Sequence, residues 1–146
     1  MSETLAVQAA HSRSVEVIAE RFVCRLADRG CGVVWIHLAG ELDIASAPRL
    51  ERMLVRAELQ TPLVVLDLRK LTFMDSFGAH VIAQASTRAQ CTGNRLILIR
   101  APRQVQRLLD LTGAAKTVEI IVLGDSEPAN QALLHLARTE RELDCA

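Results

Sequence analysis

Short apolar runs alternate with segments of helical periodicity over most of this sequence. Each run is rich in valine, isoleucine and leucine, which favour strands or a buried core, and each is too short to cross a membrane. When buried strands alternate with amphipathic helices, the strands pair largely in parallel and the helices cover the sheet. The pattern therefore predicts an α/β domain. The apolar runs are GVVWIHLAG, PLVVLDL, RLILIR and VEIIVL, at residues 32–40, 62–68, 95–100 and 118–123.

The segments between these runs carry the start and stop signals of helices. Ser46 is a suitable N-cap for a first helix, and a second helix is expected directly after Ser76. A third lies between Pro102, which is tolerated in an opening turn, and Gly113, which follows the last helical residue. The stretch after Pro128 has the amphipathic pattern of a fourth, closing helix.

A further strand precedes the first apolar run. In RFVCRLA, residues 21–27, apolar and basic residues alternate, which is typical of a half-buried strand. The turn signal at 28–30 then predicts a hairpin with the run that follows. Residues 1–18 have no steady period and are expected to form a loosely ordered arm. We predict one domain at 19–146 in the order β-β-α-β-α-β-α-β-α, a mostly parallel mixed sheet of about five strands with about four helices.

Composition and charge exclude several classes of function. Half of the residues are hydrophobic but only 3% are aromatic, so the core is aliphatic and no base-stacking platform is expected. Seventeen basic and seventeen acidic residues cancel, so no net charge attracts the chain to nucleic acid or anionic lipid. The four cysteines lack CxxC and metal-ligand spacing, and no glycine-rich phosphate loop is present. We expect a cytoplasmic protein without cofactor or metal, lacking a signal peptide and a spanning segment.

An acid and a hydroxyl, Asp75 and Ser76, stand where a buried strand gives way to a helix. In α/β sheets the carboxyl edge of the strands is the usual place for a functional site. Either side chain can act as an N-cap, worth about 1 kcal/mol. A phosphate on Ser76 would also meet the free N–H groups and the positive dipole end of the helix. Ser76 is thus a candidate cap and a candidate phosphorylation site.

Other polar residues have both a structural and a functional interpretation. Glu41 and Asp43 follow the second strand and either form a solvated turn or contact a partner. Gly78 either permits close packing or leaves room for another backbone. Asp67 is expected to cap its strand or to hydrogen-bond across the sheet, without a catalytic role. His37 is expected to be a surface or hydrogen-bonded core residue rather than a ligand.

A serine hydrolase is a further alternative. His80, four residues after Ser76, could share its helix face and act as a base, with Asp75 as the third member. Against this, the G-x-S-x-G elbow is absent, since Met74 stands where its first glycine would be. Two residues four apart on one helix also leave little room for an oriented third member. We therefore expect no enzyme activity.

Three phrases, in this order along the chain, resemble the STAS-domain anti-sigma factor antagonists of bacteria. LAGELD comes first, and the most specific phrase, LVVLDLRKLTFMDSFGAHVI, combines an apolar strand with a Met-Asp-Ser-x-Gly signature. RLILIRAPRQVQRLLDLTG follows it. The resemblance runs from about Phe22 to about Leu136, nearly the whole domain, and implies the STAS fold.

The resemblance also implies a switch controlled by phosphorylation. In that family the serine after the Asp is phosphorylated by a partner that is both a serine kinase and an anti-sigma factor, and this serine maps to Ser76. The unphosphorylated antagonist binds the kinase and frees the sigma factor, and a PP2C-type phosphatase resets the switch. No direct nucleic-acid or membrane contact is expected, and a homodimer is compatible with the pattern. The residues expected at the partner-binding surface are Glu41, Asp43, Asp75, Ser76, Phe77, Gly78 and His80.

Two residues depart from the family pattern. Phe77 stands where the family usually has Ser or Thr, and His80 where it commonly has a small residue such as Gly. Both leave the acceptor hydroxyl in place but enlarge the partner face, which narrows or changes the set of kinases that fit. The alternative that they favour is a scaffold subunit of a larger signalling or transport assembly that does not switch by phosphorylation.

Overall fold

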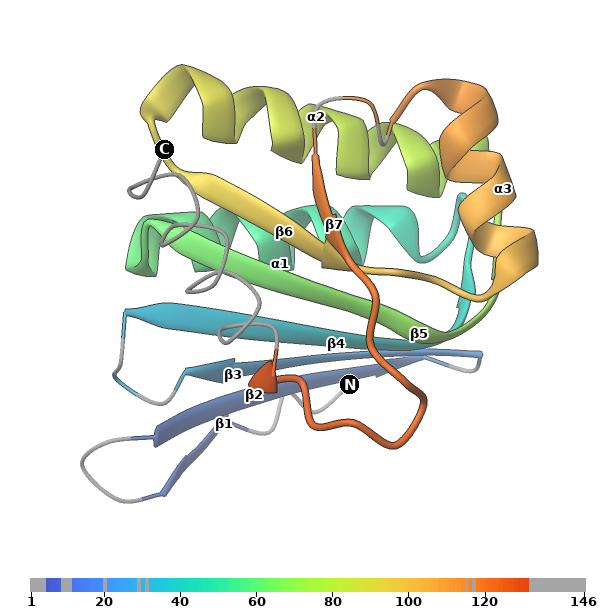
Figure 1. The fold of residues 1–146 in the computed structure, drawn as a ribbon. Coiled ribbons are helices and arrows are strands. Elements are labelled where there is room, and N and C mark those ends of the chain that lie inside the picture. The colour runs from blue at the N-terminus through green and yellow to red at the C-terminus, as the bar shows by residue number, and fades with distance from the viewer. Residues whose placement is uncertain are drawn as a thin grey trace.

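The structure of the chain is a computed structural model that describes residues 5–8, 12–19, 21–28, 30, 32–114, 116 and 118–131. Within these residues, seven strands form one sheet that is layered with three helices (Figure 1). The α/β class is confirmed. The strands are β1 (Leu5–Gln8), β2 (Ser12–Ala19), β3 (Phe22–Asp28), β4 (Val33–Leu42), β5 (Leu63–Met74), β6 (Arg95–Ile99) and β7 (Glu119–Ile121). The helices are α1 (Ala47–Gln60), α2 (Ser76–Thr92) and α3 (Arg103–Thr112).

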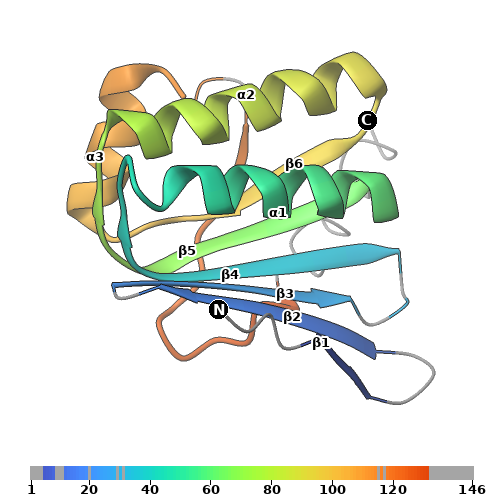
Figure 2. The ribbon, with the colours of Figure 1, turned by 180° about the vertical axis from the view of Figure 1, so that it is seen from behind.

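The strands lie side by side in chain order. From β1 to β4 they pair antiparallel, whereas from β4 to β7 they pair in parallel and a helix forms each connection. Parallel crossovers are right-handed, and all three advance in the same direction, so the helices lie on one face of the sheet (Figures 1 and 2). The sheet is mixed as predicted. It is not mostly parallel, because three of the six pairings between described strands are antiparallel.

The N-terminal stretch differs from the expectation of a loosely ordered arm over residues 1–18. β1 and all but the last residue of β2 lie in this stretch, and they add two strands to the five that the sequence predicts. Their periodic signal is short, but β2 pairs with β3 in a continuous antiparallel ladder, and Val15 joins the main core. Backbone pairing therefore orders a segment whose side-chain pattern is weak. The fourth helix predicted after Pro128 falls mostly on residues outside the described ranges.

The predicted hairpin and helix ends are confirmed. β3 and β4 pair antiparallel, and α3 ends at Gly113 as predicted, with φ at +75°, a value that favours glycine. α2 ends in the same way, at Gly93 with φ at +76°. Ser46 directly precedes α1 as predicted, although its hydroxyl makes no capping hydrogen bond with the helix. That hydroxyl instead donates to the carbonyl oxygen of Glu41 at 2.9 Å, which stabilises the turn after β4.

Two apolar clusters hold the layers together. The larger lies between the sheet and the helices, where Ile36, Leu66 and Leu98 sit opposite one another on adjacent strands and are fully buried. The smaller lies on the other face and includes Trp35 and Ile97. Because the larger cluster also contains the last residues of β4 and β5, the segments that follow these two strands are fixed at the same edge of the sheet.

Candidate functional site

Asp75 forms the connection between β5 and α2 and caps the helix. One carboxylate oxygen, Oδ1, accepts hydrogen bonds from the backbone N–H groups of Phe77 at 3.0 Å and Gly78 at 3.1 Å. Ser76 is the first residue of the helix rather than its cap. Of the two capping candidates in the sequence, the structure therefore selects Asp75, and the interpretation of Ser76 as the N-cap is wrong.

Ser76 lies exposed at the start of α2. Among the described residues, no hydrogen bond involves its hydroxyl, so the oxygen is available to a reaction partner. The expectation that a phosphate there would meet free N–H groups needs correction, since Asp75 already occupies those of Phe77 and Gly78. Ser76 directly follows Asp75, so the added charge of a phosphate would come next in sequence to a carboxylate that already caps the helix.

Asp43 organises the turn between β4 and α1. Its Oδ1 accepts hydrogen bonds from the backbone N–H groups of Ser46 at 3.1 Å and Ala45 at 2.9 Å. These donors, with that of Ser46 contributing most, hold the pKa of Asp43 below its ordinary value, so the carboxylate stays charged. Glu41, at the end of β4, forms an ion pair with Arg21 at 3.7 Å. Both acids expected from the sequence thus have structural partners and remain near the surface.

Two hydrogen bonds join this turn to the start of α2. The N–H of Asp75 donates to the carbonyl oxygen of Leu42 at 3.0 Å, and its second carboxylate oxygen, Oδ2, accepts from the N–H of Ile44 at 3.0 Å. The Asp75 carboxylate therefore uses one oxygen for each segment. The structure brings the Glu41–Asp43 turn and Ser76 together, as the predicted partner surface requires.

Gly78 is buried where α2 approaches the end of β4. A Cβ atom placed on it would lie 2.7 Å from Cγ of Leu42 and 3.1 Å from Cγ of Met74. Both neighbours belong to the main core, which leaves them little freedom to move. Of the two interpretations of this glycine, close packing accounts for it.

Replacing Gly78 by alanine is expected to lower the free energy of unfolding by about 1–3 kcal/mol, because the added methyl group overpacks the Leu42 contact. Urea denaturation measures the change. Ser76→Ala, two residues away at an exposed position, is the control and should stay within about 0.5 kcal/mol of wild type. A more stable Gly78→Ala protein, the ordinary result in a helix, would contradict the packing argument.

Three large apolar side chains are exposed around Asp75. Ile44, Phe73 and Phe77 are 60%, 48% and 51% exposed, and we call them the apolar rim. The N–H of Ile44 is bonded to Asp75, and the two phenylalanines stand two residues before and after it. The sequence draws attention to Phe77 only. Ile44 has no sequence signal, because its exposure follows from the conformation of the turn.

The hydrolase alternative finds no support in this geometry. Ser76 and His80 are both exposed on α2, and no hydrogen bond joins them among the residues that the structure describes. The Asp75 carboxylate is bonded to backbone N–H groups and does not orient the imidazole. Among the residues that the structure describes, no group of three or more His, Cys, Asp or Glu side chains is arranged to hold a metal ion.

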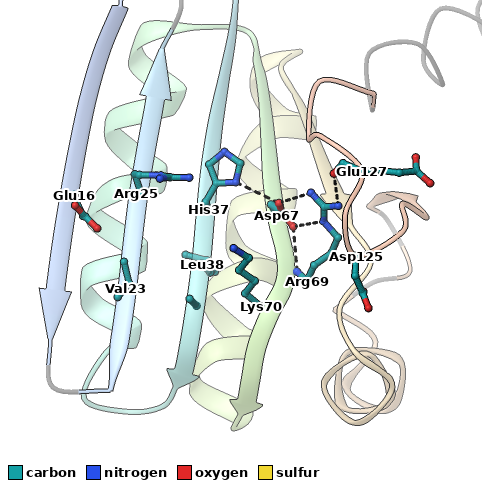
Figure 3. Close-up of a pocket in the computed structure, with 11 residues that line it drawn as sticks. Glu16, Val23, Arg25, His37, Leu38, Asp67, Arg69, Lys70, Asp125 and Glu127 are labelled. Carbon is teal, nitrogen blue, oxygen red and sulfur yellow. Dashed lines mark hydrogen bonds and ion pairs between the residues drawn. The ribbon is translucent and has the colours of Figure 1, made fainter. Parts of the chain in front are cut away.

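A second polar cluster lies on the face of the sheet away from the helices (Figure 3). Asp67 accepts hydrogen bonds from Arg69 at 3.0 and 2.9 Å and lies 3.2 Å from Nδ1 of His37. Burial alone would raise the pKa of Asp67, but the hydrogen bonds from His37 and Arg69 outweigh it and hold the pKa well below the ordinary value. The predictions of a cross-sheet hydrogen bond for Asp67 and of a hydrogen-bonded His37 are confirmed.

Comparison with known proteins gives one family. The STAS domain family matches residues 27–126. The anti-sigma-B factor antagonist of Bacillus subtilis is 30% identical over 87 residues, which are 60% of this chain and 80% of that protein.

Solved structures agree in fold. An anti-sigma factor antagonist from Mycobacterium paratuberculosis has a TM-score of 0.63 at 24% identity, over 82% of this chain and 97% of that one. The Bacillus cell fate determinant SpoIIAA in its phosphorylated form has a TM-score of 0.60 at 18% identity, over 77% and 98% of the two chains. At these identities the likeness establishes the fold alone.

The family match covers well over half of the chain, and the B. subtilis relative is matched over most of its own length. The Asp-Ser-x-Gly phrase lies within the matched residues, at the edge of the sheet where the turn after β4 meets α2. None of the described helices is long and apolar enough to span a membrane. The chain belongs to the STAS-domain family, among its anti-sigma factor antagonists.

Proposed function

We propose that Ser76 is the phosphorylation site of this anti-sigma factor antagonist, and that the unphosphorylated form binds a serine kinase that is also the anti-sigma factor. The proposal rests on one observation above all. Ser76 presents an exposed hydroxyl, without a hydrogen bond to any residue that the structure describes, at the first position of a helix whose start is fixed by Asp75. A kinase needs an accessible acceptor oxygen of this kind, held in a defined place. A PP2C-type phosphatase would restore the hydroxyl.

The apolar rim supplies the contact area for docking. Exposed aromatic and branched side chains are the usual anchors of a protein interface, and three of them surround the Ser76 segment. Two acids, Glu41 at the end of β4 and Asp43 in the turn after it, come directly before Ile44 of the rim along the chain. We infer a partner that offers an apolar pocket for the rim and basic groups for these acids.

Phosphorylation would weaken this interface through charge. The phosphate adds about −1.5 to −2 charges next to the Asp75 carboxylate, at a helix start whose N–H groups of Phe77 and Gly78 are already bonded. An interface that excludes water from both the phosphate and the Asp75 carboxylate loses affinity unless the partner offers a positive group to each of them. In this scheme the chain switches partners and catalyses nothing itself. Phe77 and His80 would restrict which kinase fits.

The test is intact-mass spectrometry of the full chain after incubation with ATP and candidate kinase/anti-sigma proteins. We expect one phosphate on wild type, none on Ser76→Ala, and removal of the phosphate by a PP2C-type phosphatase. Thr87→Ala, an exposed hydroxyl further along α2, is the matched control and should be phosphorylated like wild type. Absence of modification by every candidate would favour the scaffold-subunit alternative, and labelling of Ser76 by a fluorophosphonate would favour the hydrolase.

A further inference from the structure

A pocket of about 350 Å³ opens on the face of the sheet away from the helices. Figure 3 shows side chains from β2 to β5 and from the segment after β7 around it. This volume is within the range of small-molecule sites. The pocket lies on a different part of the sheet from the residues proposed above for kinase binding, none of which lines it.

Asp67 and Arg69 form the framework of the pocket. Both are largely buried, and Arg69 donates from two guanidinium nitrogens, Nε and Nη2, to the Asp67 carboxylate. Its third nitrogen, Nη1, donates to the carbonyl oxygens of Gly124 and Glu127, at 2.6 Å each, which fixes this segment beside the pocket. All three nitrogens are therefore occupied, so the pair shapes the pocket rather than recognising a ligand.

Arg25 and Lys70 differ from Arg69 in having charged groups that are available to a ligand. Both are exposed, and neither forms an ion pair with any described residue. In Figure 3 both side chains reach toward His37, Arg25 from β3 and Lys70 from β5, the two strands that flank β4. Lys70 reaches this face because the pairing of β4 with β5 contains an irregularity. His37 pairs with Asp67 and Ala39 with Lys70, so an advance of two residues on β4 matches an advance of three residues on β5. Such a bulge re-aims one side chain across the sheet.

We propose that this pocket binds a small phosphate-bearing anion between Arg25 and Lys70. Arginine presents paired donors that match phosphate oxygens, and lysine adds a compact point charge. His37 uses Nδ1 for Asp67, so in the neutral imidazole Nε2 is an acceptor, suited to a hydroxyl of the ligand rather than to a phosphate oxygen. Val23 and Ala39 supply apolar wall for a short carbon skeleton.

Acidic residues limit what can enter. Glu16 lines one side of the pocket, and Asp125 and Glu127 line the other, where both attract Arg69. A polyanion such as nucleic acid would meet these carboxylates on both sides. Besides the mutually paired Asp67 and Arg69, the lining holds three carboxylates and two cations, and Glu16 lies opposite Arg25 in the β2–β3 register. Only a compact phosphate monoester held close to Arg25 and Lys70 gains more from these cations than it loses to the carboxylates.

The experiment is titration of the full-length protein with inorganic phosphate, a nucleoside monophosphate and succinate, followed by calorimetry and by amide shifts in NMR. We expect saturable binding of the nucleoside monophosphate, with shifts centred on the pocket strands β3, β4 and β5. Arg25→Gln and Lys70→Gln should each weaken it about tenfold, the usual loss for one charge-assisted hydrogen bond. Arg56→Gln, which removes an exposed charge from α1, is the matched control and should bind like wild type.

Three results would overturn the proposal. The first is an absence of saturable binding by the folded wild-type protein. The second is an equal loss in Arg56→Gln, which would mean that general charge and not the pocket attracts the anion. The third is binding of succinate as tight as that of the phosphate compounds, which would remove the selection for phosphate. None of these results depends on whether Ser76 is phosphorylated.

Discussion

Replacing Asp67 by asparagine is expected to lower the free energy of unfolding by about 3–5 kcal/mol. The substitution keeps the size of the side chain but leaves the guanidinium of Arg69, whose side chain is only 11% exposed, without its counter-charge. Breaking one half of a buried ion pair is far more costly than removing a surface pair, because the remaining charge stays desolvated. Urea unfolding at neutral pH measures the loss.

The same substitution should change the pH dependence of stability. The pKa of Asp67 is lower in the folded protein than the ordinary value of about 3.9. The ionised carboxylate therefore contributes its full stability above about pH 4, and this contribution falls as the pH drops toward the folded pKa. We expect the wild-type protein to lose stability below pH 4 more steeply than Asp67→Asn.

Glu119→Gln is the matched control for this experiment. Glu119 pairs with Arg95 at 2.8 Å, but both side chains are well exposed, so the change should cost no more than about 1 kcal/mol. If Asp67→Asn were as mild as Glu119→Gln, the Asp67–Arg69 pair would not be the anchor that the geometry indicates. Equal acid sensitivity of Asp67→Asn and wild type would contradict the assigned direction of the pKa shift.

The sequence predicts the central part of this fold because local patterns and tertiary packing agree there. The run PLVVLDL is β-branched and continuous, and the strand that it forms is covered by the helices on one face. The arm over residues 1–18 shows the opposite case. There, order comes from pairing with β3, and a pairing between strands leaves little trace in the sequence of one of them.

The candidate site was predictable in place but not in detail. The Asp75–Ser76 pair is found from the sequence because it ends a strand and begins a helix. The choice between Asp75 and Ser76 as the cap depends on where the helix begins, to within one residue. Sequence patterns do not locate a helix boundary with that precision. The bond from Ile44 to Asp75 spans 31 positions and follows from the pairing of β4 with β5. The convergence of Arg25 and Lys70 likewise depends on register and a bulge.

Replacing Ser76 by glutamate is expected to leave the fold intact and to weaken the complex with the kinase/anti-sigma partner at least tenfold. The position is exposed, and a carboxylate gains from the helix dipole about what it loses by repulsion from Asp75, so the stability should stay within about 0.5 kcal/mol. In the proposed interface the same carboxylate is enclosed next to Asp75 without a partner. A cost of about 3 kcal/mol for such a charge corresponds to a loss of about a hundredfold.

Calorimetric titration of the unphosphorylated proteins with the kinase measures this effect directly. Thr87→Glu adds the same charge to an exposed position eleven residues further along α2, about 16 Å away, and should bind like wild type. Equal affinities of Ser76→Glu and wild type would contradict a switch at this helix start. A loss shared by Thr87→Glu would show that total charge controls the complex. Loss in Ser76→Glu alone identifies the segment that Asp75 holds in place as the surface where phosphorylation acts.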